Sequence, residues 1–130
     1  MLVNVARESG AAWHVGDGEN HWPMVHIDDL AALFVLALER AQPGSVFIAS
    51  EGEAPKMRDI AAAASVAAGA GGETRSWPVG EARAALGPFV DALLLDQQAS
   101  SAKARELLGW RPTRPQALDD LRKGSYAAAA

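Results

Sequence analysis

Cysteine is absent from the chain, and no long run of apolar residues occurs in it. The first absence excludes disulfide bonds and thiolate chemistry. The second excludes a membrane-spanning helix, which needs roughly 18 consecutive apolar residues. The amino terminus also lacks the basic region and apolar stretch of a secretory signal peptide. We therefore expect a cytoplasmic protein that has no membrane partner.

Positively charged side chains are few: 12 Lys and Arg stand against 16 Asp and Glu, for a formal net charge of -4. Proteins that bind nucleic acids need basic side chains clustered on one surface, so nucleic acid is not an expected partner. Hydrophobic residues make up 49% of the chain and charged residues 22%, which is typical of a globular protein. A chain of 130 residues is long enough for one domain.

The segment 22–49 predicts a strand, a helix and a second strand. Residues 22–27 are expected to form the first strand, and Asp28 is expected to cap a helix over 29–40. The second strand is expected over 45–49. Short connections of this kind build parallel sheets, in which the crossover is right-handed. The sequence therefore predicts a parallel βαβ unit.

The helix in this unit is apolar at every position from Leu30 to Leu38. A helix that is apolar all round is buried on more than one side, and an open sheet edge invites pairing with another chain. We therefore expect this segment to belong to a larger layered core. On its own, the chain is expected to form a homo-oligomer through the exposed sheet edge or the apolar helix.

The remaining predicted elements are shorter and mostly helical. Helices are expected over 2–9, 57–68, 81–86, 89–95 and 115–123, with one more that Ser100 or Ser101 caps and that stops at Gly109, and strands over 12–15 and 74–77. These two strands could pair with each other in a separate small sheet. The sequence thus predicts a single α/β domain over 1–130, in which 22–49 is the βαβ unit and 55–126 is a helical subdomain.

Glycine clusters occur without the pattern that binds nucleotides. A dinucleotide site needs a Gly-rich turn between a strand and a helix, and no G-x-G-x-x-G sequence is present. The clusters at 16–18 and 69–72 are interpreted as turns. The P-loop and G-x-S-x-G motifs are missing as well. No catalytic residue and no cofactor-binding residue is therefore predicted.

Histidine and aspartate residues gather early in the chain, namely His14, His21 and His26 with Asp17, Asp28 and Asp29. A small independent enzyme built on this cluster is the least favoured reading, because the spacing matches no standard ligand pattern, and no metal site is predicted. The adjacent carboxylates of Asp28 and Asp29 could act as a general acid or base. We favour a structural role for them, because acidic residues stabilise the start of a helix.

The four tryptophans stand at positions 13, 22, 77 and 110. They could line a pocket. Packing in the core is the interpretation we favour, since large aromatic side chains dominate buried contacts. Trp110, which follows Gly109, is expected to be a packing anchor.

Two motifs resemble those of a known family. Val25-His-Ile-Asp-Asp-Leu-Ala31 follows Gly16-Asp-Gly-x-Asn20 and Trp22, and Ser100-Ser-Ala-Lys-Ala-Arg-Glu-Leu-Leu-Gly-Trp-Arg-Pro112 lies downstream. In this order and spacing they are similar to the carboxyl-terminal half of the extended short-chain dehydrogenase/reductases, the NAD-dependent epimerase/dehydratase group. The resemblance covers nearly the whole chain.

The resemblance implies a partial Rossmann-type fold that lacks the amino-terminal, cofactor-binding half. The strands predicted at 22–27 and 45–49 would be the last two of the Rossmann sheet, and the rest would be the small α/β substrate-binding subdomain. The family's Gly-rich loop and catalytic Tyr-x-x-x-Lys pair belong to the other half, and Tyr126, the only tyrosine, cannot form such a pair. NAD(P) is implied for the full-length family, whereas no cofactor is expected for this chain alone.

The implied function is the C-terminal substrate-binding portion of an NAD(P)-dependent epimerase/dehydratase-like (nucleoside-diphosphate-sugar epimerase-like) protein, without catalysis on its own. Asn20, Trp22 and His26 are the expected substrate contacts. Many nucleotide-sugar members place an arginine at the position of Trp22 to engage a diphosphate, so this departure argues against a nucleotide sugar. The alternative is a stand-alone, self-associating interaction module, and both readings leave open whether the chain belongs to an enzyme.

Overall fold

The computed structural model describes residues 2–52 and 54–126, which form seven helices and one parallel sheet of two strands. In chain order the elements are α1 (Leu2–Ser9), β1 (Ala12–Val15), α2 (Ile27–Arg40), α3 (Met57–Ala67), β2 (Thr74–Trp77), α4 (Val79–Leu86), α5 (Phe89–Leu93), α6 (Ala102–Leu108) and α7 (Ala117–Lys123). The helices in this part of the chain are all too short or too polar to cross a membrane.

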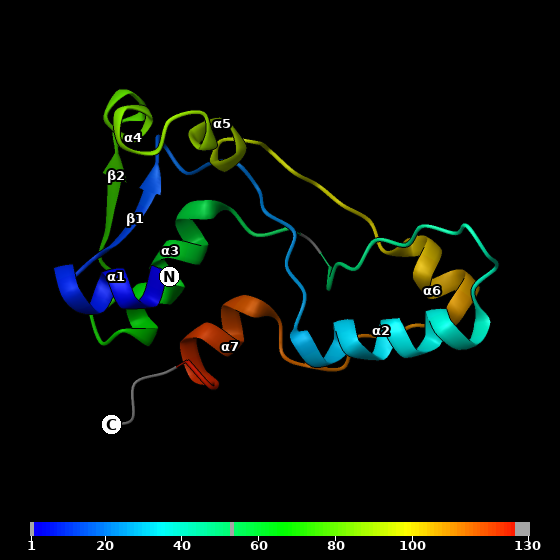
Figure 1. Ribbon diagram of the computed structural model, residues 1–130. Helices are drawn as coiled ribbons and strands as arrows, with labels where there is room; N and C mark the ends of the chain where they lie inside the picture. Colours follow the sequence, from blue (N-terminus) through cyan, green and yellow to red (C-terminus); the bar gives the residue numbers. More distant parts are fainter. Residues whose placement is uncertain (1, 53, 127–130) are drawn as a thin grey trace.

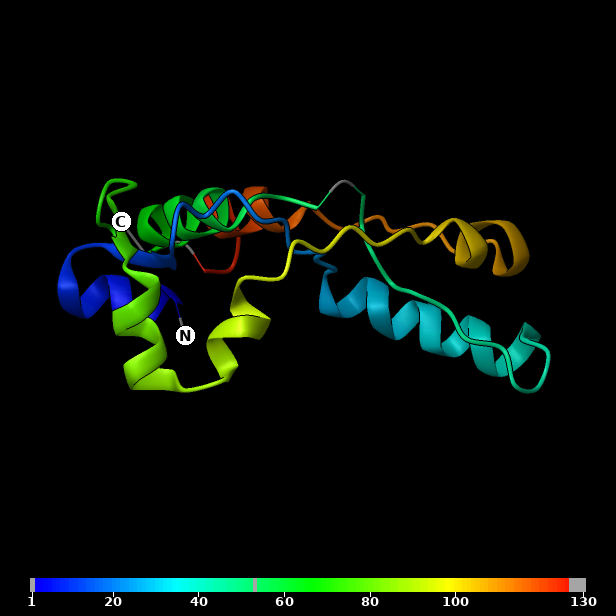
Figure 2. The same ribbon diagram turned by 90° about the horizontal axis from the view of Figure 1, so that it is seen from above.

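Two lobes are visible in Figures 1 and 2. The sheet lobe comprises α1, β1, α3, β2, α4, α5 and α7, and the α2 lobe comprises α2, α6 and the extended residues 45–50 and 109–114. The sequence-based boundaries of the single domain stay a prediction. In space, however, α6 lies against α2 rather than with the other helices of 55–126.

The parallel sheet pairs two segments that are far apart in the sequence. Ala12 lies opposite Thr74 and Val15 lies opposite Trp77, so β1 and β2 are in register along their whole length. α1 and α3 pack against β1. The expectation that 12–15 and 74–77 pair in a small sheet is confirmed.

The core of the sheet lobe consists largely of alanine. Ala61, Ala63, Ala64 and Ala67 of α3 are fully buried, and α3 contacts α1, α7 and both strands. The distance between packed helices depends on the side chains at the contact. These small side chains therefore allow one short helix to serve as the common neighbour of four other elements.

The predicted βαβ unit over 22–49 is wrong in its two strands. Residues 22–26 and 45–49 are extended, but neither joins a ladder of the described sheet. Phe47 packs on the core of the α2 lobe, whereas Val46 is 75% exposed. A strand is a paired structure, and among the described residues 45–49 makes no backbone hydrogen bond to another extended segment.

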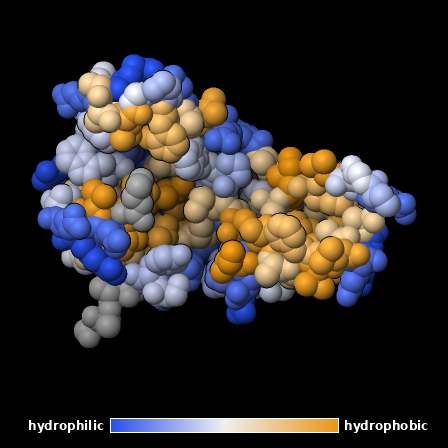
Figure 3. All heavy atoms as spheres, viewed as in Figure 1, coloured by the Kyte–Doolittle hydropathy of each residue, from blue (hydrophilic) through white to orange (hydrophobic). Residues whose placement is uncertain are grey.

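The expectation that the apolar helix is buried on more than one side is also wrong for this chain. Leu33 is buried against α6 and Trp110, with Leu36 and Ala37 beside it. The other flank carries exposed apolar side chains in helical spacing (Figure 3), which we call the α2 stripe: Ile27, Ala31, Phe34, Val35 and Leu38. No described residue covers this flank.

Helix ends deviate slightly from the prediction. The α2 helix begins at Ile27, and its N-cap is His26 rather than Asp28, because the His26 Nδ1 atom accepts a hydrogen bond from the Asp28 backbone N–H at 3.1 Å. The α6 helix ends as predicted before Gly109, whose φ of 70° is left-handed. Such differences of one or two residues leave the element order unchanged.

Asp29 joins the start of α2 to the chain after α6. Its side-chain oxygens accept hydrogen bonds from the backbone N–H groups of Thr113 (2.9 Å) and Arg114 (3.0 Å), and its backbone carbonyl accepts one from the Trp110 indole at 2.8 Å. Asp29 is 4% exposed and Trp110 is 1% exposed. Trp110 is thus the packing anchor that the sequence predicts, and Asp29 has the structural role.

Replacing Asp29 with Asn should lower the free energy of unfolding by about 2 kcal/mol, because a charged acceptor is lost and a buried backbone N–H is left unsatisfied. Asp28→Asn is the matched control. Asp28 is half exposed and forms an ion pair with the Arg114 side chain at 2.9 Å, so its loss should cost less than about 1 kcal/mol. Urea denaturation measures both values, and equal losses would contradict the role given to Asp29.

Candidate functional site

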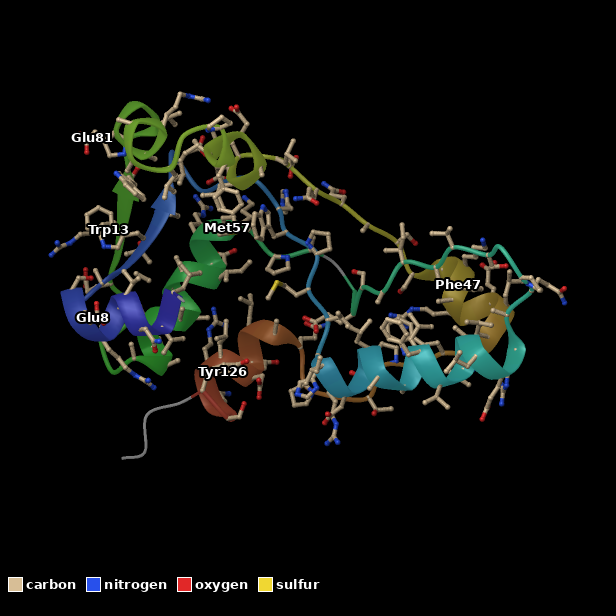
Figure 4. The ribbon with its side chains drawn as sticks, viewed as in Figure 1. Glu8, Trp13, Phe47, Met57, Glu81 and Tyr126 are labelled. Carbon is tan, nitrogen blue, oxygen red and sulfur yellow. The ribbon has the colours of Figure 1, made fainter. Side chains whose placement is uncertain are left out.

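A pocket of about 630 Å³ opens in the sheet lobe. Its aromatic wall consists of Trp13, Trp22, Trp77 and Phe89, its aliphatic wall of Leu2, Val5, Val15, Met57, Leu86 and Leu93, and its polar side chains are His14, Asn20 and Glu81. These residues come from α1, β1, β2, α4, α5, the start of α3 and the segment after β1. Figure 4 labels Trp13 on β1, Met57 at the start of α3 and Glu81 on α4.

The pocket resolves the two interpretations of the tryptophans. Trp13 and Trp77 stand in the two paired strands, and Trp22 reaches the same pocket from the segment after β1. Trp110 lies in the other lobe, in the core. Three of the four tryptophans therefore line a pocket, which is the less favoured reading of the sequence. The signal that could have found it is the predicted pairing of 12–15 with 74–77.

The structure brings two of the three predicted substrate contacts together. Asn20 and Trp22 line the pocket, whereas His26 lies outside its lining and caps α2. The Asn20 side-chain amide donates to the backbone carbonyls of Leu93 (2.9 Å) and Leu95 (3.1 Å). Asn20 therefore holds the end of α5 at the pocket wall. Contact of these residues with a substrate stays a prediction.

Residues 16–26, which we call the connector, run from β1 to α2 and are held on one side by an imidazole–carboxylate contact. The backbone N–H of His21 donates to an Asp96 side-chain oxygen at 2.8 Å, and the His21 Nδ1 atom lies 2.7 Å from the same oxygen. These two hydrogen bonds lower the pKa of Asp96. Gln97 N–H closes the contact by donating to the His21 carbonyl at 2.8 Å.

The other side of the connector is bonded to the start of α3. The backbone N–H of Trp22 donates to Pro55 O at 3.0 Å, and the N–H of Met57 donates to Asn20 O at 2.9 Å. Backbone hydrogen bonds therefore join the connector to the chain on each side of it. They hold Asn20 and Trp22 in position without using the side chains of these two residues.

Two cations near the pocket are already paired. Lys56 Nζ lies 2.6 Å from a Glu19 oxygen, and Arg58 binds the other Glu19 oxygen. The hydrogen bond from Lys56, helped by the charge of Arg58, lowers the pKa of Glu19. Lys56 and Arg58 flank Met57 in the sequence, yet neither lines the pocket. Near the pocket, Lys56 and Arg58 are therefore both paired with Glu19, whereas the Arg75 guanidinium lies 5.7 Å from the ring centre of Trp13 in the pocket wall.

Two buried nitrogen atoms at the pocket lack a hydrogen-bond partner among residues 2–52 and 54–126: Trp22 Nε1 and His14 Nδ1. The His14 ring lies against Gly18, where an added Cβ would come within 2.8 Å of Nδ1. The indole N–H of Trp22 is a donor only. A hydrogen-bond partner of Trp22 Nε1 must therefore be an acceptor, whereas His14 Nδ1 can donate or accept.

The histidines and aspartates of the early chain do not converge. His21 pairs with Asp96, and His26 caps α2. Across the described ranges, no three His, Asp or Glu side chains lie close enough to hold a metal ion. The arrangement offers no acid–base pair at the pocket beyond the separate side chains of His14 and Glu81.

Comparison of the sequence with known proteins finds two relatives, and comparison with solved structures finds a similar fold. No protein-family model matches the chain. The chain is 36% identical over 131 positions to uncharacterized protein C2A9.02 of Schizosaccharomyces pombe, covering 97% of this chain and 42% of the relative. It is 32% identical over 122 positions to uncharacterized protein YLL056C of Saccharomyces cerevisiae, covering 94% and 40%. The chain thus spans about two fifths of the length of these curated relatives.

Among solved structures, the chain resembles RMD from Pseudomonas aeruginosa, which was solved in complex with NADPH. The TM-score is 0.62 at 16% identity, over 93% of this chain and 39% of that one. At this identity the match shows the fold alone. The α/β arrangement described above recurs as part of an NADPH-bound protein, which is consistent with a partial Rossmann-like fold.

Gly18→Ala should destabilise the connector more than Gly10→Ala. Both glycines have left-handed φ angles, 67° and 73°, but an added Cβ at Gly18 would meet His14 and Arg58, whereas at Gly10 it would meet nothing within 4 Å. The left-handed conformation alone costs about 1–2 kcal/mol for a residue with a Cβ, and the clash should add about 1–3 kcal/mol. Thermal and urea unfolding of both variants measures the difference, and equal losses would refute the close contact.

Proposed function

We propose that the chain forms the substrate-binding portion of an NAD(P)-dependent epimerase/dehydratase-like protein of the short-chain dehydrogenase/reductase type. The observation that carries the proposal is the fold match over 93% of the chain to part of an NADPH-bound protein. The two sequence motifs support it. Asn20 and Trp22, which follow the first motif's glycines, line the pocket that would serve as the substrate side.

The residues present do not fit the pyrophosphate of a dinucleotide. The turn at Gly18 has no open cradle, because its carbonyl accepts the Arg58 N–H at 3.0 Å and its Cα faces His14 and Arg58. No helix opens at this turn, since α2 begins only at Ile27. The glycines at 69–72 follow a helix instead of a strand. The chain therefore contributes substrate contacts, and the cofactor would bind to another part of a longer protein.

The α2 stripe supports the same proposal. Large apolar patches on a surface mark an interface, and the exposed Phe34 and Leu38 lie on the flank of α2 opposite the buried Leu33. Beside the helix, Val46 and Ile48 are exposed on an extended segment that joins no sheet. A helix and an unpaired extended segment of this kind are suited to complete a layered α/β core.

The proposal predicts that the chain alone shows no saturable binding of NADPH, followed by the fluorescence of the nicotinamide. Fused behind the amino-terminal part of the Schizosaccharomyces pombe relative, it should give a cooperatively folding protein that binds NADPH. Replacing Phe34 and Leu38 with Glu should abolish that cooperativity, because burying each of these apolar side chains contributes about 1.5–3 kcal/mol to the free energy of unfolding. Leu107→Glu, at a position 64% exposed on α6, is the matched control.

Micromolar binding of NADPH by the chain alone would contradict the proposal. A fusion that unfolds cooperatively without binding NADPH would contradict it as well.

A stand-alone, self-associating module is the second candidate, and the α2 stripe favours it too. In this case two copies would bury the stripe against each other. Sedimentation velocity should then show a dimer for the purified chain. Because fully burying a Phe or Leu is worth about 1.5–3 kcal/mol, Phe34→Glu or Leu38→Glu should weaken the dimer at least about tenfold, while Leu107→Glu should not. A chain that stays monomeric at every concentration tested would exclude this candidate.

A further inference from the structure

A second pocket, of about 660 Å³, lies where the chain passes between the two lobes, and we call it the junction pocket. The connector, the chain after the extended residues 45–50 and the chain that leads from α5 into α6 all contribute to its lining (Figure 1). Its polar side chains are those of His21, Gln98, Ser100, Ser101 and Arg105, and no Asp or Glu is among the lining residues. The volume falls within the range of small-molecule sites.

Arg105 is held in place at three points. Its Nε–H donates to Ser101 Oγ at 3.0 Å, an Nη2 N–H donates to the Glu51 carbonyl at 3.2 Å, and its guanidinium carbon lies 5.6 Å from the ring centre of Trp110. The Ser101 hydroxyl is itself fixed, because it is buried and donates to the Ser50 carbonyl at 2.8 Å. The guanidinium is therefore preorganised at the pocket wall, as a binding group should be.

The charge of Arg105 is not compensated by residues 2–52 and 54–126. The acceptors that it reaches, a hydroxyl and a carbonyl, are neutral, and it forms no ion pair with a described carboxylate. Its Nη1 atom donates to no acceptor in these ranges. Arg83 and Arg114, by contrast, are paired with Asp91 and Asp28. A fixed guanidinium with donors to spare is suited to a planar oxyanion.

His21 and Ser100 add hydrogen-bonding groups to the same pocket. The His21 Nδ1 atom is engaged by Asp96, so Nε2 is the ring nitrogen that is left for a ligand, and it makes no hydrogen bond to another described residue. The Ser100 hydroxyl accepts the Ala102 N–H at 3.2 Å and can still donate its own proton. The walls therefore offer partners to hydroxyl groups, unlike the apolar walls of the tryptophan-lined pocket.

The charges at the junction pocket favour a carboxylate over a phosphate. One guanidinium supplies one positive charge, which a single carboxylate matches. A phosphate monoester carries a charge of about −1.5 to −2 at neutral pH, so part of its charge would stay unpaired. The Asp96 carboxylate behind His21 adds a further negative charge. The chemistry of the lining thus points to an anion of single charge.

We propose that the junction pocket binds a hydroxylated monocarboxylate, whose carboxylate accepts hydrogen bonds from Arg105 and whose hydroxyl groups bond to His21 and Ser100. This inference goes beyond the proposed function and does not rest on it, because the binding requires neither NADPH nor a partner on the α2 stripe. Its failure would leave the proposed function untouched.

Four compounds with a six-carbon chain test the proposal on the unmodified chain. Gluconate has the carboxylate and the hydroxyls, gluconamide lacks the charge, hexanoate lacks the hydroxyls, and glucitol 6-phosphate carries a phosphate instead. Gluconate should shift the ¹H–¹⁵N signals of the Arg105 Nε–H group and the His21 ring saturably and leave those of His26, outside the pocket, unchanged. Hexanoate should bind at least about fivefold more weakly and gluconamide at least about tenfold more weakly, because hydrogen bonds to a charged group contribute more. The phosphate should bind more weakly than gluconate.

Arg105→Gln removes the charge and should weaken gluconate binding at least about tenfold without changing that of gluconamide. Arg111→Gln is the matched control, since Arg111 is exposed and does not line the pocket, and it should leave the affinity unchanged. The indole N–H signal of Trp110, which reports the hydrogen bond to Asp29, verifies that the α2 lobe is folded. The comparison of compounds needs no variant, so the proposal can be tested even if Arg105→Gln unfolds this lobe.

Glu53 stands between the lining residues Gly52 and Ala54 in the sequence and lies outside the described residues. Glu53→Gln should change the affinity for gluconate by less than about tenfold, which corresponds to 1.4 kcal/mol. Gluconate binding that appears only in this variant would overturn the proposal. Gluconamide or glucitol 6-phosphate binding as tightly as gluconate would overturn it too, and so would an Arg105→Gln variant that is folded and binds gluconate undiminished.

Discussion

The backbone hydrogen bonds on both sides of the connector are the constraint on which the rest of the structure depends. Residues 16–26 leave β1, pass between the start of α3 and the chain after α5, and reach α2. The bonds to Pro55 and Met57 on one side and to Asp96 and Gln97 on the other fix this path. Without them, the two lobes would be joined by unpaired chain, and the pocket would lose one wall.

Polar and aromatic residues have different structural roles around the connector. The charged pairs, Glu19 with Lys56 and His21 with Asp96, lie on its flanks and hold it in place. Trp13, Trp22 and Trp77 line the pocket and supply apolar surface. Glu81 is the one acidic side chain among the lining residues, and the Arg75 guanidinium lies 5.7 Å from the ring centre of Trp13 in the pocket wall.

Most local structure was predictable from sequence, and the errors have one cause. The ends of α1, β1 and β2 follow from Gly10, Gly16 and Pro78, and the structure reproduces them. The segments 22–27 and 45–49 have the composition of strands, but a strand needs a ladder of hydrogen bonds. The described sheet contains neither segment, and 22–27 makes isolated backbone hydrogen bonds instead, such as Trp22 N–H to Pro55 O and Glu51 N–H to Met24 O. The apolar character of α2 predicts burial on two sides, and this chain supplies only one, formed by α6 and Trp110. Of the predicted site residues, Asn20 and Trp22 reach the pocket, whereas His26 stands at the end of the connector and caps α2 in the other lobe.

The sequence by itself determined the order of the elements, the absence of a dinucleotide turn and the apolar nature of α2, because each of these depends on neighbouring residues. Only the tertiary structure decided that Trp13, Trp22 and Trp77 share a pocket, that Asp29 binds the backbone after Trp110, and that one flank of α2 is exposed. Those features depend on contacts between residues far apart in the chain. Local pattern sets which surfaces are apolar, but only the three-dimensional path of the chain sets which of them meet.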